Sequence, residues 1–209
     1  MSDGGGVEGT VFVVDDDEAV RESLALLVQS VGLEVETFDS AGAFLDAFDS
    51  ERPGCLVTDI RMPGMSGLEL QERLTEDGAL VPVIVLTGHG DVPAAVRALK
   101  GGAVDFVEKP YNPQALLDLV QQAIVRDAEV RRQAAQEAEV AERLARLTPR
   151  EHEVMTLVVA GKANKVIAIE LDISERTVEL HRGRIMKKMQ VRSLADLMRL
   201  VLPQGQNTL

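Results

Sequence analysis

With 209 residues, 45% of them hydrophobic, the chain is long enough for two small domains that each bury an apolar core. A single cysteine excludes an internal disulfide, and no apolar run approaches the roughly 18 residues of a membrane span, so we expect a cytoplasmic protein without membrane segments. The net charge of −12 argues against nucleic-acid binding by the whole chain, but residues 1–124 carry 7 basic and 22 acidic side chains and residues 148–209 carry 10 and 7, so only the latter segment suits DNA.

The N-terminal part of the chain predicts an α/β domain. Residues 1–9 are rich in glycine, unlike a signal peptide, and are expected to be disordered. Within residues 10–124, short apolar runs alternate with helical patterns, and we predict strands at residues 10–14, 34–38, 55–58, 83–86 and 104–107. The first, third and fourth runs are almost continuously apolar, as in parallel strands covered on both faces, whereas the second alternates like an edge strand.

Capping residues mark the starts of the intervening helices. Ser40, Asp91 and Asn112 are predicted N-caps, and Pro113 suits the first helical position. Five strand–helix units in this order predict a doubly wound, five-stranded parallel sheet.

Residues 125–146 differ in composition from the domain before them. They contain no glycine or proline and are dominated by alanine, glutamate, glutamine and arginine, which predicts a continuous helix extending the fifth helix. Because the apolar positions are sparse, we interpret this segment as a semi-rigid linker, with a short intersubunit coiled coil as the alternative.

An all-α domain is predicted at residues 147–203, followed by a flexible tail at 204–209. Four helices are expected at residues 149–160, 164–171, 175–189 and 193–202, and Thr148 with Glu151 forms a predicted capping box before the first. The second and third helices fit a helix-turn-helix, in which Ala168 is small enough for close crossing. The apolar residues with the spacing for a shared core are Ile167, Leu171, Ile173, Val178 and Ile185.

Polar residues follow the predicted strands of the α/β domain. Three acids follow the first strand, namely Asp15, Asp16 and Asp17. One polar residue stands at the end of each of the third, fourth and fifth strands, namely Asp59, Thr87 and Lys109. The carboxyl ends of parallel strands meet at one edge, so these side chains are expected to converge. Carboxylates so close repel one another, and Mg²⁺ with several retained waters would relieve that repulsion. Asp59 is then a candidate nucleophile toward phosphorus, with Thr87 binding a phosphoryl oxygen and Lys109 offsetting its charge.

Four segments carry a family resemblance, namely residues 13–17, 57–67, 87–90 and 108–110. They resemble the signature segments of two-component receiver domains, which have a flavodoxin-like fold. The resemblance implies that Asp59 accepts a phosphoryl group from a sensor histidine kinase. It also implies that Asp16, Asp59 and the Arg61 carbonyl hold Mg²⁺, with Asp15 acting mainly through water, and that the Lys109–Pro110 bond is cis.

The same resemblance implies a conformational switch. Phosphorylation would draw Thr87 inward and rotate Phe106 into the vacated space, although Phe106 could instead be a core aromatic. The surface formed by residues 91–125 would then pair with its copy in a homodimer.

The C-terminal residues 147–202 resemble a LuxR-type output domain, on the segments 147–151, 164–165, 176–179 and 191–193. A receiver followed by this domain resembles a FixJ/NarL-type response regulator, closest to the FixJ branch. The implied partners are double-stranded promoter DNA and RNA polymerase. The implied base contacts are Glu179, Leu180 and Gly183, and the implied phosphate contacts are Lys165, Thr177, Arg182, Lys188 and Arg192.

Three other functions remain open. A metal-dependent phosphatase would carry its nucleophile after the first strand, whereas Asp59 follows the third, so we expect no enzyme activity beyond self-phosphorylation and self-dephosphorylation. A ligand-sensing LuxR-type regulator would lack the receiver segments. An orphan regulator would bind DNA without phosphorylation, and the intact set of acids, Thr87 and Lys109 argues against it without excluding it.

Overall fold

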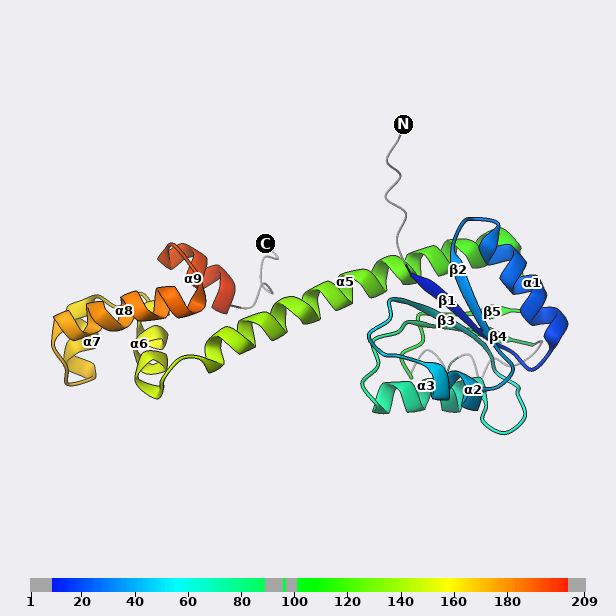
Figure 1. Cartoon of the computed structure of the whole chain (residues 1–209), viewed down its shortest axis with the longest axis horizontal. Coiled ribbons are helices and arrows are strands. Elements are labelled where there is room, and N and C mark those ends of the chain that lie inside the picture. Colours follow the sequence, from blue (N-terminus) through cyan, green and yellow to red (C-terminus); the bar gives the residue numbers. More distant parts are fainter. Residues whose placement is uncertain (1–8, 89–95, 97–100, 203–209) are drawn as a thin grey trace, which may run out of the picture. The chain divides into compact units, whose positions relative to one another are not determined.

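The structure, a computed structural model, describes residues 9–88, 96 and 101–202 (Figure 1). The chain divides into two compact units, Met1–Arg132 and Gln133–Leu209. Among the described residues, no helix is both long and apolar enough to cross a membrane. The predicted N-cap Asp91, most of the predicted disordered N-terminus and the predicted tail at 204–209 lie outside the described residues.

The first unit is built on a five-stranded parallel sheet, as the sequence predicts. The strands are β1 (Thr10–Val14), β2 (Glu34–Phe38), β3 (Gly54–Asp59), β4 (Val83–Thr87) and β5 (Asp105–Glu108), and their order is β2-β1-β3-β4-β5. The alternating strand β2 lies at the edge, as its pattern indicates. Strand β5 begins one residue later than predicted, and β3 extends by one residue at each end.

Helices cover both faces of this sheet. Helices α2 (Ala41–Ala47) and α3 (Gly67–Glu76) pack on one face around Phe12, Phe44 and Leu70. Helices α1 (Glu18–Gln29) and α5 (Pro113–Ala145) pack on the other face (Figure 1). The strands β1, β3 and β4 are buried on both sides, and this burial accounts for their continuous apolar runs.

Gly67, at the start of α3, fixes how closely this helix approaches the end of β3. A Cβ at this position would lie 2.1 Å from the main-chain oxygen of Asp59 and 2.9 Å from the Thr58 hydroxyl. Only glycine permits this approach, so the helix backbone packs directly against the strand end that carries Asp59.

Helix α5 confirms the prediction that the linker segment continues the fifth helix, because it runs for 33 residues without a break. Asn112 caps it by accepting from the amides of Gln114 and Ala115. The helix stays bonded to the first unit beyond residue 124, where the sequence places the end of the domain. Asp127 Oδ2 accepts from the Gly54 amide at 2.9 Å, and Arg131 donates to the Ser50 carbonyl at 2.6 Å.

The second unit contains the four predicted short helices. They are α6 (Pro149–Val159), α7 (Asn164–Glu170), α8 (Glu175–Met189) and α9 (Leu194–Val201). Thr148 and Glu151 form the predicted capping box, and Ser174 caps α8. Their core contains the buried residues Ile167, Ala168, Val178 and Ile185, with Leu171 and Ile173 packed against it, which confirms the predicted helix-turn-helix core.

Candidate functional site

Two carboxylates and one ammonium meet at the carboxyl edge of the sheet. Lys109 Nζ lies 2.6 Å from Asp59 Oδ1 and 3.0 Å from Asp15 Oδ2. Asp15 follows β1, Asp59 ends β3 and Lys109 follows β5, so three strands bring these side chains together. The side chains of Asp15 and Asp59 are only 3% and 13% exposed, which strengthens their attraction to the ammonium.

The charge of Lys109 is stabilised by its two partners. Burial acts to lower the pKa of Lys109, but the hydrogen bonds to Asp59 and Asp15 outweigh it and leave that pKa above its ordinary value. The ammonium therefore stays charged at neutral pH. The sequence predicts repelling carboxylates that need an added cation, whereas in the structure the Lys109 ammonium already lies between two of them.

Local hydrogen bonds orient both carboxylates. Asp59 Oδ2 accepts from the Arg61 amide at 2.7 Å, and Asp15 Oδ1 accepts from the Asp17 amide at 3.0 Å. Arg21, on α1, donates from Nη1 to the main-chain oxygen of Asp15 at 2.8 Å. Sequence reasoning missed Arg21 because it lies on a helix face and not at a strand end.

Thr87 and Phe106 lie on the neighbouring strands β4 and β5. Thr87 is 3% exposed, and its hydroxyl donates to the Gly88 carbonyl at 3.1 Å. Phe106 is 38% exposed and belongs to neither hydrophobic cluster of this unit, which contradicts its alternative interpretation as a core aromatic. In the segment that connects these strands, residues 89–95 and 97–100 lie outside the described residues.

The oxygen atoms at this edge fit a magnesium ion. Within the described ranges, no three His, Cys, Asp or Glu side chains are grouped closely enough to hold a metal by themselves. Magnesium does not require such a group, because it binds through one or two carboxylates and keeps several waters. Asp16 follows β1 and is exposed, Asp59 ends β3 and is partly buried, and the Arg61 carbonyl lies two residues beyond Asp59, so all three offer the hard oxygen ligands that this ion prefers.

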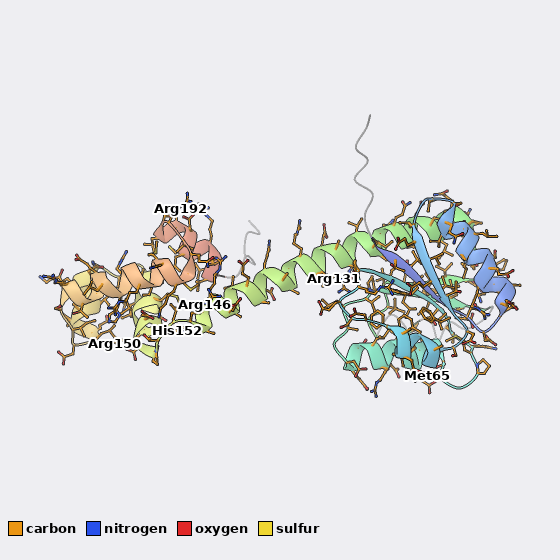
Figure 2. All side chains as sticks on the ribbon, in the orientation of Figure 1. Met65, Arg131, Arg146, Arg150, His152 and Arg192 are labelled. Carbon is orange, nitrogen blue, oxygen red and sulfur yellow. The ribbon has the colours of Figure 1, made fainter. Side chains whose placement is uncertain are left out.

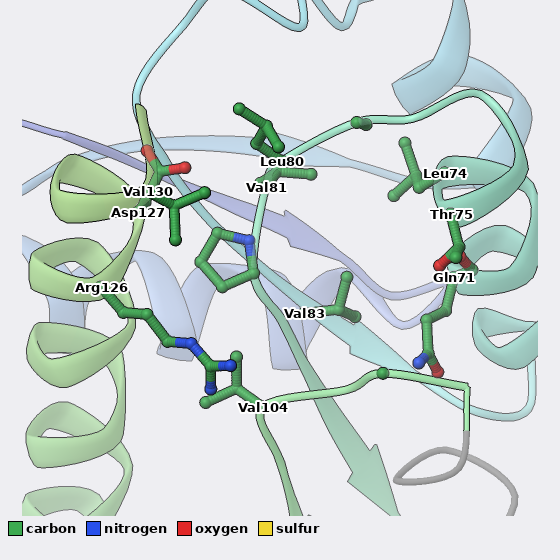
Figure 3. A pocket seen from close by; sticks show the side chains of 13 residues that line it. Gln71, Leu74, Thr75, Leu80, Val81, Val83, Val104, Arg126, Asp127 and Val130 are labelled. Carbon is green, nitrogen blue, oxygen red and sulfur yellow. The ribbon is translucent and has the colours of Figure 1, made fainter. Parts of the chain in front are cut away.

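A cavity of about 230 Å³ lies at the opposite edge of the sheet, at the amino ends of β4 and β5 (Figure 3). Its lining includes the apolar residues Leu80, Val81 and Val104, and Arg126 extends from α5 toward Val104. Because parallel strands carry Asp59 and Lys109 at their other ends, this cavity is separate from the acidic edge.

Helix α8 of the second unit has one buried and one exposed face. Val178, Ile185 and Met189 face the core. The exposed side chains on the opposite face are Arg176, Glu179, Leu180, Arg184 and Lys187. Leu180 is 56% exposed, and a Cβ added at Gly183 would meet nothing within 4 Å. The three residues predicted to touch bases therefore lie where a DNA groove has access to them.

The predicted phosphate contacts fall into two groups. Lys165 and Arg192 are exposed. Three others have partners within the unit: Thr177 Oγ1 lies 2.8 Å from the Ser174 hydroxyl, Arg182 donates to Asn164 Oδ1 at 3.0 Å, and Lys188 pairs with Glu151 at 2.6 Å. A phosphate would have to compete with these partners.

Comparison with known proteins assigns the chain to a family. The family model described as response regulator receiver domain matches residues 11–121, and the model described as bacterial regulatory proteins, luxR family, matches residues 145–201. The transcriptional regulatory protein FixJ of Azorhizobium caulinodans is 52% identical over 195 residues, which are 93% of this chain and 92% of that protein. The chain belongs to the response regulators.

Other relatives of this response regulator agree with that assignment. FixJ of Bradyrhizobium diazoefficiens is 46% identical, with 95% of this chain and 97% of that protein covered. The response regulator protein TodT of Pseudomonas putida is 46% identical over 90% of this chain and 83% of that protein. The solved structure of the response regulator StyR matches with a TM-score of 0.86 at 50% identity, covering 93% of this chain and 98% of StyR.

Glu151 of this response regulator is a buried acid, and the sequence did not predict that it pairs with a lysine. Glu151 is 3% exposed, and its Oε2 accepts from Lys188 Nζ at 2.6 Å and from the Thr148 amide at 2.8 Å. The hydrogen bond from Lys188, followed by that from the Thr148 amide, lowers the pKa of Glu151 to about 2. The capping-box pattern predicts the bond to Thr148, but no local signal identifies a lysine 37 residues away.

Proposed function

We propose that this response regulator accepts a phosphoryl group on Asp59 from a sensor histidine kinase in the cytoplasm, dimerises, and binds promoter DNA to regulate transcription. The proposal is carried by one observation, the Lys109 ammonium held 2.6 Å from Asp59 and 3.0 Å from Asp15 at the carboxyl edge of the sheet. Ligands of open α/β sheets bind at this edge.

The chemistry follows from the positions of these groups. An oxygen of the Asp59 carboxylate attacks the phosphorus of a phosphohistidine, the phosphorus–nitrogen bond breaks with its electron pair returning to the imidazole, and an acyl phosphate forms. Lys109, already charged, offsets part of the negative charge that arrives. Asp16, Asp59 and the Arg61 carbonyl would hold Mg²⁺, with Asp15 contributing mainly through water, and the ion would supply further positive charge to the phosphoryl oxygens.

Thr87 and Phe106 then report the phosphoryl group to the surface. The Thr87 hydroxyl exchanges its bond to the Gly88 carbonyl for one to a phosphoryl oxygen, and Phe106 turns from its half-exposed position toward the space that Thr87 leaves. This biases an existing equilibrium between two conformations toward the one whose surface at residues 91–125 pairs with a second copy.

The second unit reads DNA through α8. Glu179, Leu180 and Gly183 face base edges in the major groove, as their exposure allows. Lys165 and Arg192 contact phosphates, joined by Thr177, Arg182 and Lys188 where these give up their partners within the protein. The dimer would bind two half-sites about one helical turn apart and act with RNA polymerase.

The experiment compares wild type with Asp59→Asn, incubated with Mg²⁺ and a small phosphoryl donor such as acetyl phosphate. We expect the wild type alone to gain one phosphoryl group by intact-protein mass spectrometry and to shift toward a dimer in size-exclusion chromatography. Asp49→Asn, an exposed acid beyond α2, is the matched control and should label normally. Equal labelling of wild type and Asp59→Asn would contradict the proposal. The DNA affinity of the wild type is also compared before and after labelling. Labelling without any change in that affinity would favour the orphan regulator.

A further inference from the structure

The last turn of helix α5 is bonded to the DNA-binding unit. The Arg143 side chain is only 17% exposed, although its helix segment is otherwise largely solvated. Its Nη1 donates to the main-chain oxygen of Met189 at 3.2 Å, and its Nη2 pairs with Glu139 on its own helix at 2.5 Å. One residue further along, the Leu144 carbonyl lies 3.0 Å from His152 Nε2 of α6.

Met189 is the last residue of the recognition helix α8, where carbonyl groups lose their helical partners. The chain turns into the left-handed region at Gln190, with φ 55°. The Gln190 amide then donates to the Lys187 carbonyl, and the Val191 amide donates to the Met186 carbonyl. The Met189 carbonyl is bonded instead by Arg143, whose positive charge also suits the negative end of the helix dipole.

This bond lies close to residues that the proposed function uses. The Met189 side chain is fully buried in the core of the unit, so the end of α8 is fixed from inside by packing and from outside by Arg143. Arg192, a proposed phosphate contact, follows three residues later (Figure 2). A change in the position of Arg143 would therefore move the turn that presents Arg192.

We propose that Arg143 is a positioning residue for DNA binding, which holds the carboxyl end of the recognition helix and couples it to helix α5. The proposal rests on the proposed DNA-binding function of the second unit. Arg143 precedes the segment matched by the luxR family model, which begins at residue 145, and the sequence places it in the linker. Its pair with Glu139, whose side chain is 60% exposed, contributes little by itself, so the bond to Met189 is the contact that matters.

The test compares Arg143→Met with Arg146→Met in the full-length protein, with each variant first incubated with Mg²⁺ and acetyl phosphate. Both changes remove one positive charge from the end of α5 and keep a long apolar stem. Arg146, directly after α5, pairs with Glu142 of that helix and is 48% exposed, which makes it the matched control (Figure 2). Arg143→Lys retains the charge and a donor and serves as the conservative rescue.

Two readouts separate positioning from a general loss of structure. The first is the affinity for a mixed-sequence DNA duplex across a range of salt concentrations, measured by fluorescence anisotropy. We expect Arg143→Met to bind about fivefold more weakly, as loss of one hydrogen bond implies, with Arg146→Met close to wild type and Arg143→Lys partly restored. The second is amide hydrogen exchange, in which Gln190 and Val191 should exchange about fivefold faster in Arg143→Met alone.

Three results would overturn the proposal. Equal affinity and equal exchange in Arg143→Met and Arg146→Met would remove the positioning role. A salt slope lower by about 0.9 in Arg143→Met would make Arg143 a direct phosphate ligand. Faster exchange throughout the unit would make it a general stabiliser. If the phosphorylated wild type binds no duplex, the proposed function fails, and the exchange of Gln190 and Val191 alone decides whether Arg143 holds the end of α8.

Discussion

At the scale of single residues, the ion pairs around Lys109 differ from those on the protein surface. Asp15 is almost fully buried, so removing the ammonium would leave a carboxylate without its counter-charge in a poorly solvated place. Exposed pairs such as Arg73–Asp77, with side chains 59% and 54% exposed, carry no such penalty.

We predict that Lys109→Met lowers the rate of phosphoryl uptake from a small donor by about a hundredfold, the usual effect of removing one preorganised charge partner. Arg73→Met should react at the wild-type rate. The measurement is labelling over time at saturating Mg²⁺, with folding checked by circular dichroism. A well-folded Lys109→Met protein that labels as fast as wild type would exclude a role for this ammonium in the transfer.

Glu151 gives the C-terminal unit a defined pH dependence. Its pKa is about 2 in the folded protein, against an ordinary value of 4.5, so the charged form stabilises the fold. That stabilisation is complete above pH 4.5 and is lost as the pH falls from 4.5 toward 2. We predict that Glu151→Gln lowers the free energy of unfolding by about 1.5 to 3 kcal/mol at neutral pH and that the difference disappears near the acid end of this window.

The measurement is hydrogen exchange of the slowest amides of α6 and α8 in both proteins as a function of pH. Glu153→Gln is the control, because Glu153 is 52% exposed and pairs with Arg150 within one helical turn. A constant difference between wild type and Glu151→Gln down to the acid end would contradict the assignment of this titration to Glu151.

Two adjacent lysines near the end of α8 separate stability from DNA contact. Lys188 pairs with the buried Glu151, whereas Lys187 is exposed. We predict that Lys188→Met destabilises the unit by about 3 to 5 kcal/mol, because it leaves a buried charge unpaired. Lys187→Met should change stability by no more than about 0.5 kcal/mol.

For DNA binding, Lys188→Ala and Arg182→Ala are both expected to weaken affinity across sequences, as lost phosphate contacts would. Affinity should be compared at temperatures where each variant remains folded. If Lys188→Ala keeps its affinity under those conditions, its role is confined to the pair with Glu151.

At the scale of helices and strands, sequence patterns predicted most elements because their causes are local. Apolar periodicity located all five strands to within one residue, and the Asn112, Ser174 and Thr148 caps marked helix starts. Patterns did not locate partners far apart in the chain. The bond from the Gly54 amide to Asp127 joins residues 73 positions apart, and nothing in either segment indicates the other.

This bond leads to a prediction about helix α5. Asp127 has a side chain that is fully buried, and it pairs with Arg131 while accepting from Gly54. We predict that Asp127→Ala destabilises the first unit by about 3 kcal/mol, since it leaves a buried amide and a partly buried guanidinium unpaired. Asp118→Ala, which breaks only an exposed bond to Gln114, should stay within about 0.5 kcal/mol of wild type in urea unfolding.

At the scale of the whole molecule, the sequence predicted the family and the order of domains because the relevant motifs recur at strand ends and helix starts. Convergence of Asp15, Asp59 and Lys109 was predictable, since parallel strands end at one edge. The Arg143–Met189 bond was not, because it joins a linker residue to a main-chain oxygen, a group that every residue carries. Side-chain identity gives no clue to such a contact.

The molecule also contains its own optical probe. It has one tyrosine and no tryptophan, and Tyr111 follows the Lys109–Pro110 pair and packs against the hydrophobic cluster between the sheet and helices α1 and α5. Burial raises the pKa of Tyr111, so its phenol stays neutral well beyond physiological pH. All intrinsic tyrosine emission therefore originates two residues from Lys109. We therefore predict that the proposed phosphoryl transfer to Asp59 changes the intensity of that emission in the unlabelled protein.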